Sequence, residues 1–187
     1  NDVVFDFSVK PRLSSERGNA MLVASSIFEA CRYYSLFRRT PLSDSCALVT
    51  SYSPSAQDVS AEDTGAQTET EKQFIYSTYI DLLAAARQTG QGTTEAYEDW
   101  AKSVFTREPA RLKLLIVVDK LLTGFDAPPC TYLYIDKSMQ DHGLFQAICR
   151  VNRLDSEDKT FGYIVDYKDL FRKVETAIAV YTSELDD

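Results

Sequence analysis

The run Leu112-Lys-Leu-Leu-Ile-Val-Val118 constrains the fold more than any other stretch of the sequence. A short, nearly continuous run of apolar and β-branched residues is typical of a strand that is covered on both faces. Such strands occur in parallel sheets, because the crossover helices of a parallel sheet cover both of its faces. The sequence therefore favours an α/β fold built on a central parallel sheet.

The rest of the chain alternates between strand-like and helix-like patterns. Apolar runs predict further strands at 19–24, 46–52, 131–135 and 161–165, and apolar positions at helical spacing predict helices at 71–88, 93–106, 144–152 and 168–185. Together these elements predict a three-layer, open and mostly parallel sheet of about five strands. The two helices within 71–107 are expected to form an inserted helical hairpin.

A further helix is predicted between the first two strands. Ser26 and Glu29 have the spacing of a capping box, and apolar residues recur at helical spacing from there until Pro41 ends the pattern. Strand, helix and strand in this order predict a right-handed crossover unit of a parallel sheet.

Two segments are expected to lie outside this regular pattern. No Lys or Arg occurs between Arg39 and Lys72, while six acidic residues do, and residues 53–70 contain almost no large apolar side chain. Residues 53–70 are therefore expected to form a mobile acidic surface loop. Residues 1–18 are expected to connect the domain at 19–187 to whatever precedes it.

Composition excludes several functional classes. With 44% hydrophobic residues among 187, the chain can build a sizeable core, and a net charge of -8 argues against a generally basic surface for nucleic acid or anionic membranes. Any contact with nucleic acid must be local. No apolar run approaches the roughly 18–20 residues of a membrane span, and the first residues lack the order of a signal peptide, so a soluble cytoplasmic protein is expected.

The cysteines predict neither a metal site nor a disulfide framework. Cys31, Cys46, Cys130 and Cys149 form no Cys-x-x-Cys pair, and His142 is the single histidine. All four cysteines are expected to be free, buried and reduced.

The chemistry-bearing residues gather in two segments. The chain has neither the Gly-x-x-x-x-Gly-Lys-Ser/Thr phosphate loop nor the Gly-x-Gly-x-x-Gly dinucleotide turn. It does have Asp119-Lys-Leu-Leu-Thr-Gly-Phe-Asp-Ala-Pro128 after a predicted strand, where open α/β sheets bind ligands. It also has Gln146-Ala-Ile-Cys-Arg150-Val-Asn-Arg153, whose two arginines lie on neighbouring positions of one helix face and suit phosphate binding.

These two segments resemble motifs V and VI of superfamily 2 helicases and translocases, and most closely those of the motor (R) subunit of type I restriction enzymes. The run Ala20-Met-Leu-Val-Ala-Ser-Ser26 looks like motif IV of that family, and Tyr134-Ile-Asp-Lys137 looks like the segment that joins motifs V and VI. The resemblance extends over about residues 19–167. The Gln-Arg-x-Gly-Arg opening that is frequent in the broader superfamily is absent at 146–150, which fits the type I subgroup.

The resemblance implies a second RecA-like domain that closes on ATP together with a first one. Arg150 and Arg153 would face the γ-phosphate as arginine fingers, with Gln146 nearby, and Gly124 and Asp126 would border the ribose and the hinge of the cleft. ATP and Mg²⁺ would be held mainly by the first domain, which is absent from these residues, so this chain alone is expected to be inactive.

The resemblance also implies binding partners. Ser25, Ser26 and Thr123 would contact the backbone of double-stranded DNA. The parent subunit would assemble with the methyltransferase and specificity subunits of the same restriction complex, and no membrane is involved.

Simpler interpretations stay open for each residue. Arg150 and Arg153 fit exposed arginines paired with Asp155 or Glu157, Gly124 fits a tight turn in the left-handed region, and Ser26 fits a helix cap alone. At the level of function, the alternatives are a doubly wound nucleotide-binding domain or small enzyme, and a protein-interaction lobe without motor activity.

Overall fold

The computed structural model describes residues 2–55, 69–122, 124–139, 141–151, 155, 159 and 161–171. Within this part, positions 69, 141, 142, 145 and 150 are described by their backbone alone. The predicted loop at 53–70 and the predicted closing helix at 168–185 lie mostly outside the described residues, and Thr123 and Arg153 lie outside them altogether.

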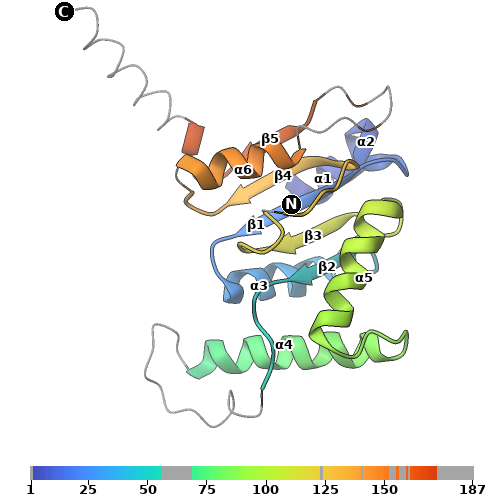
Figure 1. Ribbon diagram of the computed structural model, residues 1–187, viewed down its shortest axis with the longest axis vertical. Coiled ribbons are helices and arrows are strands. Elements are labelled where there is room, and N and C mark those ends of the chain that lie inside the picture. Colours follow the sequence, from blue (N-terminus) through green and yellow to red (C-terminus); the bar gives the residue numbers. More distant parts are fainter. Residues whose placement is uncertain are drawn as a thin grey trace, which may run out of the picture.

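Five parallel strands form one open sheet in the order β2-β3-β1-β4-β5 (Figure 1). Every residue of β1, β2 and β3 is buried, as expected for strands that are covered on both faces. The predicted α/β fold with a central parallel sheet is therefore confirmed. The strand bounds are β1 Asn19–Ala24, β2 Cys46–Val49, β3 Leu114–Val117, β4 Cys130–Asp136 and β5 Tyr163–Asp166.

The strand order creates a switch point in the middle of the sheet. The chain passes from β1 through α3 (Ile27–Phe37) to β2, but β3 lies between β1 and β2 and pairs with both. β4 pairs with the other side of β1, and its own connection leads onward to β5. The connections that leave β1 and β4 thus run in opposite directions, and open α/β sheets bind ligands at the carboxyl ends of strands at such a point.

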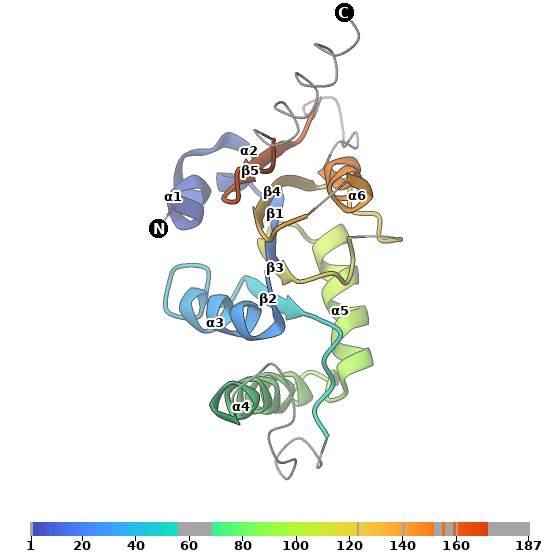
Figure 2. The same ribbon diagram turned by 90° about the vertical axis from the view of Figure 1, so that its left-hand side faces the viewer.

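Helices cover both faces of the sheet. α3 and α1 (Asp2–Val9) lie on one face, and α5 (Thr94–Arg107) and α6 (Asp141–Val151) lie on the other (Figure 2). α4 (Glu69–Arg87) packs against α3, away from the sheet. The two helices expected within 71–107 are therefore present, but α5 is a sheet-covering helix because its Ala101 and Phe105 are fully buried.

The N-terminal segment, predicted to be a connecting segment, contacts the sheet. It contains α1 and a short second helix, α2 (Pro11–Ser14). The Tyr134 hydroxyl of β4 donates to the Asp6 carboxylate of α1 at 2.8 Å. The ammonium group of Lys113 donates to two backbone carbonyls that follow α2. These bonds fix the segment against the sheet.

The cysteines follow the prediction with one exception. All four are free, and Cys31, Cys46 and Cys130 are buried. Cys149 is exposed, so the prediction that it is buried was wrong. It lies on the solvent side of α6, a position that apolar neighbours in the sequence do not reveal.

None of the helices in the described part of the chain is long and apolar enough to cross a membrane.

Candidate functional site

The carboxyl ends of the strands gather at one edge of the sheet, which faces the viewer in Figure 2. Ser25 and Ser26 directly follow β1 at this edge, the loop that contains Gly124 follows β3, and Asp136 ends β4. Three of the segments that the sequence singled out therefore begin at the edge where parallel sheets bind ligands.

Ser26 begins α3. Its Oγ accepts a hydrogen bond from the backbone N–H of Glu29 at 3.1 Å, which confirms the predicted cap. Ser25, directly before it, is exposed. The first amides of a helix favour anions such as phosphate, and a serine can cap a helix and contact a phosphate together. The geometry thus allows both roles at Ser26.

The loop after β3 is anchored by apolar side chains and opens at Gly124. Leu121, Leu122 and Phe125 are buried, whereas Gly124 is exposed. Gly124 has a φ of +67°, and apart from its chain neighbours no atom of the described residues lies within 4 Å of the place where a Cβ would stand. The predicted left-handed glycine is confirmed, and the open space beside it permits close approach of a ligand.

Leu121 has the same unusual backbone conformation. Its φ is also +67°, a region that costs an L-residue with a side chain about 1–2 kcal/mol. The buried side chains of the loop offset this cost. No sequence signal marks the position, because leucine is normally excluded from this region.

The second half of the loop lies beside α5. The Oγ1 of Thr106, near the end of that helix, donates to the backbone oxygen of Asp126 at 3.4 Å. The ring centroids of Phe105 and Phe125 are 6.2 Å apart. The carboxylate-bearing side chain of Asp126 is exposed. Because α6 covers the same face as α5, both segments predicted to bind nucleotide lie on one face of the sheet (Figure 2).

The α6 helix buries one stripe and presents the predicted residues elsewhere. Leu144, Ala147 and Val151 are buried, while Gln146 is half-buried. Position 150 follows Gln146 by one helical turn, so both lie on the same side of α6, away from the buried stripe.

The structure therefore separates the predicted residues into two groups. Ser25 and Ser26 lie at the start of α3, on one face of the sheet. Gly124, Asp126 and Gln146 lie on the opposite face, among α5 and α6.

Asp136 is a polar residue of the edge, within the segment Tyr134–Lys137, to which the sequence assigned no role of its own. It accepts hydrogen bonds from the hydroxyl of Tyr33 and, at 2.9 Å, from the ammonium of Lys168. Burial alone would raise the pKa of Asp136, but the bonds from Lys168 and Tyr33 outweigh burial and hold that pKa below its usual value. The sequence signal that could have identified Asp136 was its position as an acidic residue at the end of a predicted parallel strand.

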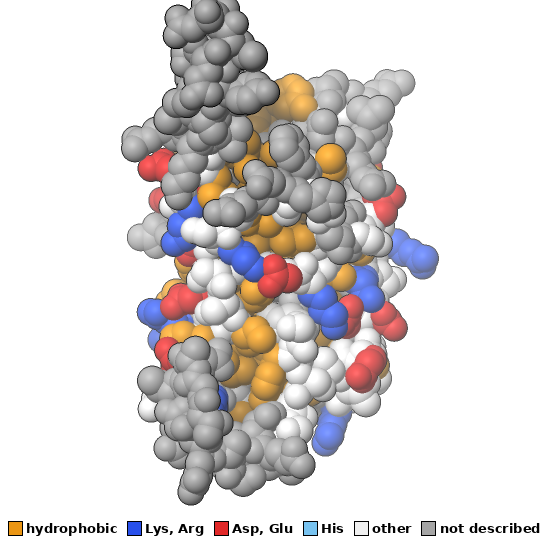
Figure 3. All heavy atoms as spheres, turned by 60° about the vertical axis from the view of Figure 1, so that its left-hand side comes forward, with side chains coloured by type: hydrophobic (Ala, Val, Ile, Leu, Met, Phe, Trp, Pro, Cys, Tyr) orange, Lys and Arg blue, Asp and Glu red, His pale blue; other side chains and the backbone are white. Residues whose placement is uncertain are grey.

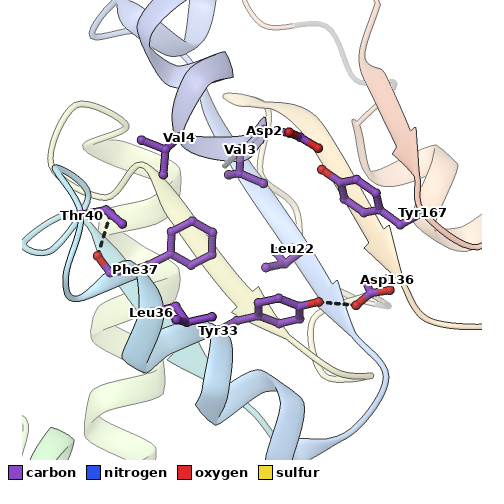
Figure 4. Close-up of a pocket in the computed structure, with 10 residues that line it drawn as sticks. All are labelled: Asp2, Val3, Val4, Leu22, Tyr33, Leu36, Phe37, Thr40, Asp136 and Tyr167. Atoms are coloured by element: carbon purple, nitrogen blue, oxygen red, sulfur yellow. Dashed lines mark hydrogen bonds between the residues drawn. The ribbon is translucent and has the colours of Figure 1, made fainter.

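A cavity of about 450 Å³ lies next to Asp136, between α1 and α3 (Figure 4). Figure 4 shows Tyr33 and Asp136 at one end, with their hydrogen bond, and Phe37 and Val3 farther along. None of the predicted site residues in the described part of the chain lines this cavity. It lies on the face opposite the Gly124 loop, so it is separate from the segments predicted to bind nucleotide.

Charged side chains are interspersed around the edge. On the face seen in Figure 3, basic and acidic groups alternate, with apolar surface between them, and the described residues form no continuous basic patch. Lys137 pairs with Asp119, and Lys120 pairs with Glu98 at 2.5 Å. The edge therefore offers few unpaired positive charges to a polyanion.

Comparison with known proteins identifies similar sequences. The family model described as type I restriction enzyme subunit R domain 3 matches residues 16–169. The SauCOLORF180P endonuclease subunit of Staphylococcus aureus (strain COL), a type I restriction enzyme, is 42% identical over 77 residues, covering 41% of this chain and 8% of that protein. The type I HindI endonuclease subunit of Haemophilus influenzae is 47% identical over 74 residues, covering 38% of this chain and 7% of that protein.

Among solved structures, the DEAD-box protein SrmB of E. coli, in a complex with the regulator of ribonuclease activity A, aligns with a TM-score of 0.32 and 12% identity, covering 84% of this chain and 82% of that chain. That score is too low to assign a fold. The matched part of each similar endonuclease subunit is less than a tenth of its length.

Proposed function

Because the chain belongs to the family of domain 3 of type I restriction enzyme R subunits, we propose that it is the second RecA-like lobe of an ATP-dependent motor that moves double-stranded DNA. The parent subunit in this proposal is the complete R subunit, which also contains the first lobe. The observation that carries the proposal is the placement of the Gly124 loop and α6 on one face of the sheet, within the residues that the family model matches.

In this proposal, that face closes on ATP. Arg150 and Arg153 act as arginine fingers that stabilise the negative charge developing on the γ-phosphate. Gln146 lies on α6, one helical turn before position 150. Gly124 lets the loop approach the ribose closely, since no atom occupies the place of a Cβ, and the exposed Asp126 carboxylate is suited to accept hydrogen bonds from hydroxyl groups.

The phosphate-binding loop and Mg²⁺ belong to the first lobe in this proposal. Among the described residues, no group of three or more His, Cys, Asp or Glu side chains is arranged to hold a metal ion.

DNA would bind at the carboxyl edge of the sheet. Ser25, Ser26 and Thr123 contact the phosphate backbone in this proposal, with the start of α3 supplying amides. Such contacts carry no sequence information. Recognition of the target sequence then falls to the specificity subunit, and the methyltransferase subunit completes the restriction complex.

The isolated chain is expected to show no ATPase activity, because half of the nucleotide site belongs to the first lobe. Steady-state phosphate release from the purified chain with Mg²⁺-ATP and duplex DNA measures this. Turnover that the Arg150→Ala variant eliminates would mean that this chain holds a complete site, which contradicts a shared one.

DNA binding by the isolated chain is expected to be weak, with a shallow dependence on salt. Few phosphates are contacted, the net charge is -8, and each phosphate neutralised contributes about -0.9 to the slope of log affinity against log salt. Fluorescence anisotropy with two duplexes of unrelated sequence measures both properties. Tight binding at physiological salt, or preference for one duplex, would contradict the assignment of Ser25, Ser26 and Thr123.

A further inference from the structure

A buried lysine lies at the amino-terminal end of β4, against the turn that ends the Gly124 loop. Lys159 is 1% exposed. Its ammonium donates hydrogen bonds to the backbone oxygens of Pro128, at 2.5 Å, and Cys130, at 2.7 Å. Those oxygens belong to a β-turn, since the Cys130 N–H donates to the oxygen of Ala127 at 3.0 Å. Lys159 therefore holds the turn that ends the Gly124 loop.

Lysine is almost never fully buried unless it is paired, because the charged form loses its hydration. Burial lowers the pKa of Lys159, and the nearby Asp155 carboxylate acts against that shift. The two short bonds to carbonyl oxygens replace water. An apolar residue could fill the same space without this electrostatic demand, so the retained ammonium points to a positional task.

A second set of bonds fixes the same region. The Arg12 guanidinium of α2 pairs with Asp155 at 2.5 Å and donates through Nε to the Oγ1 of Thr131 at 3.1 Å. That Oγ1 in turn donates to the oxygen of Pro129, within the same turn, at 3.0 Å. The Arg12 side chain is only 13% exposed, so solvent screens this ion pair less than a surface pair.

Both ends of this bonded cluster lie close in sequence to the proposed ATP contacts. Pro128 comes two residues after Asp126, and Asp155 comes two residues after Arg153. The inference that follows from this closeness in sequence rests on the proposed function. We propose that Lys159, together with the Arg12–Asp155 pair, is a positioning residue that fixes the distance between the Gly124 loop and the proposed arginine fingers, Arg150 and Arg153.

The expected consequence is specific to catalysis. Arginine fingers act on charge that develops in the transition state, so a displaced finger lowers kcat and leaves KM for ATP nearly unchanged. A displacement of about 1 Å in a catalytic group can cost about a hundredfold in rate. Loss of the Lys159 bonds is therefore expected to lower kcat by about ten- to a hundredfold.

The test uses the intact parent subunit with DNA present, at a temperature where circular dichroism shows each variant to be folded. Lys159→Met removes the ammonium and keeps the chain length, and Asp155→Asn weakens the partly exposed pair if the methionine variant fails to fold. Tyr79→Phe is the matched control, because it removes a buried 2.6 Å hydrogen bond to Thr50. Thr50 directly follows β2, the outermost strand on the side of the sheet opposite β5. Arg150→Ala is measured in parallel.

The expected result is a tenfold or greater loss of kcat in Lys159→Met and a smaller loss in Asp155→Asn, with KM for ATP within about twofold of wild type. Tyr79→Phe should keep the wild-type kcat even if its melting temperature falls as far as that of Lys159→Met. Wild-type kcat in both cluster variants, with Arg150→Ala inactive, would overturn the positioning role and leave the motor proposal standing. Wild-type kcat in Arg150→Ala would overturn the motor proposal itself.

Discussion

Alanine at position 150 or 153 of the intact parent subunit is expected to lower ATP turnover by about a thousandfold or more and to abolish DNA translocation. The reason is the loss of a cation aimed at the γ-phosphate in the transition state. The expected change in the free energy of unfolding is about 1 kcal/mol or less, the range for loss of an exposed ion pair. Steady-state ATP hydrolysis and displacement of a third DNA strand ahead of the moving enzyme measure the two activities.

Two further variants make the result specific. Lysine at position 150 should fail like alanine, because an ammonium cannot reproduce the planar fork of a guanidinium. Arg107→Ala is the control, since this exposed arginine ends α5 on the same face of the sheet, and it should be fully active. Wild-type hydrolysis by both alanine variants would mean that these arginines are ordinary surface residues.

The Gly162→Ala variant is expected to destabilise the domain by about 2–3 kcal/mol, or about 4–12 °C in melting temperature. A Cβ at Gly162 would lie 2.3 Å from the backbone oxygen of Val151, at the end of α6. Backbone must therefore move, which is costlier than the shift of a flexible side chain. Urea unfolding followed by circular dichroism gives the change in the free energy of unfolding.

Gly143→Ala is the matched control. Gly143 also lies in the α6 region, but the nearest atom to its Cβ position is 3.7 Å away, and alanine favours a helix over glycine by about 0.5–1 kcal/mol. This variant should be neutral or slightly more stable. Equal stability of the two variants would show that α6 does not approach Gly162 as closely as described.

The sequence predicted the strands of the sheet well, but it did not predict which strands pair. The bounds of the first strand match the predicted 19–24, because a short apolar run has few alternatives once it is buried on both faces. The strand predicted at 46–52 ends at Val49, since Tyr52 packs on Tyr79, with ring centroids 5.0 Å apart, without joining the sheet. Local pattern carries no information on which strands pair, so the place of β3 between β1 and β2 was not predicted.

Sequence motifs identified the residues of the candidate site, but they did not identify the residues that hold the site in place. Ser26 and Gly124 follow local rules of caps and turns, which short sequence patterns express. Lys159 and Arg12 act through partners 29 and 119 residues away along the chain, and a lysine is ordinarily read as a surface residue. Gly162 offered a weak signal, because a glycine at the start of a strand often marks close backbone approach.

The central claim is that one ATP site is shared between this domain and another part of its parent. The direct test is to measure ATP hydrolysis by three samples. These are this chain alone, the first lobe of the parent alone, and the two lobes together, either joined in one chain or mixed. We expect negligible turnover by either part alone, DNA-stimulated turnover by the two together, and loss of that turnover when this chain carries Arg150→Ala. Full turnover by either part alone, or by the mixture with Arg150→Ala, would contradict it.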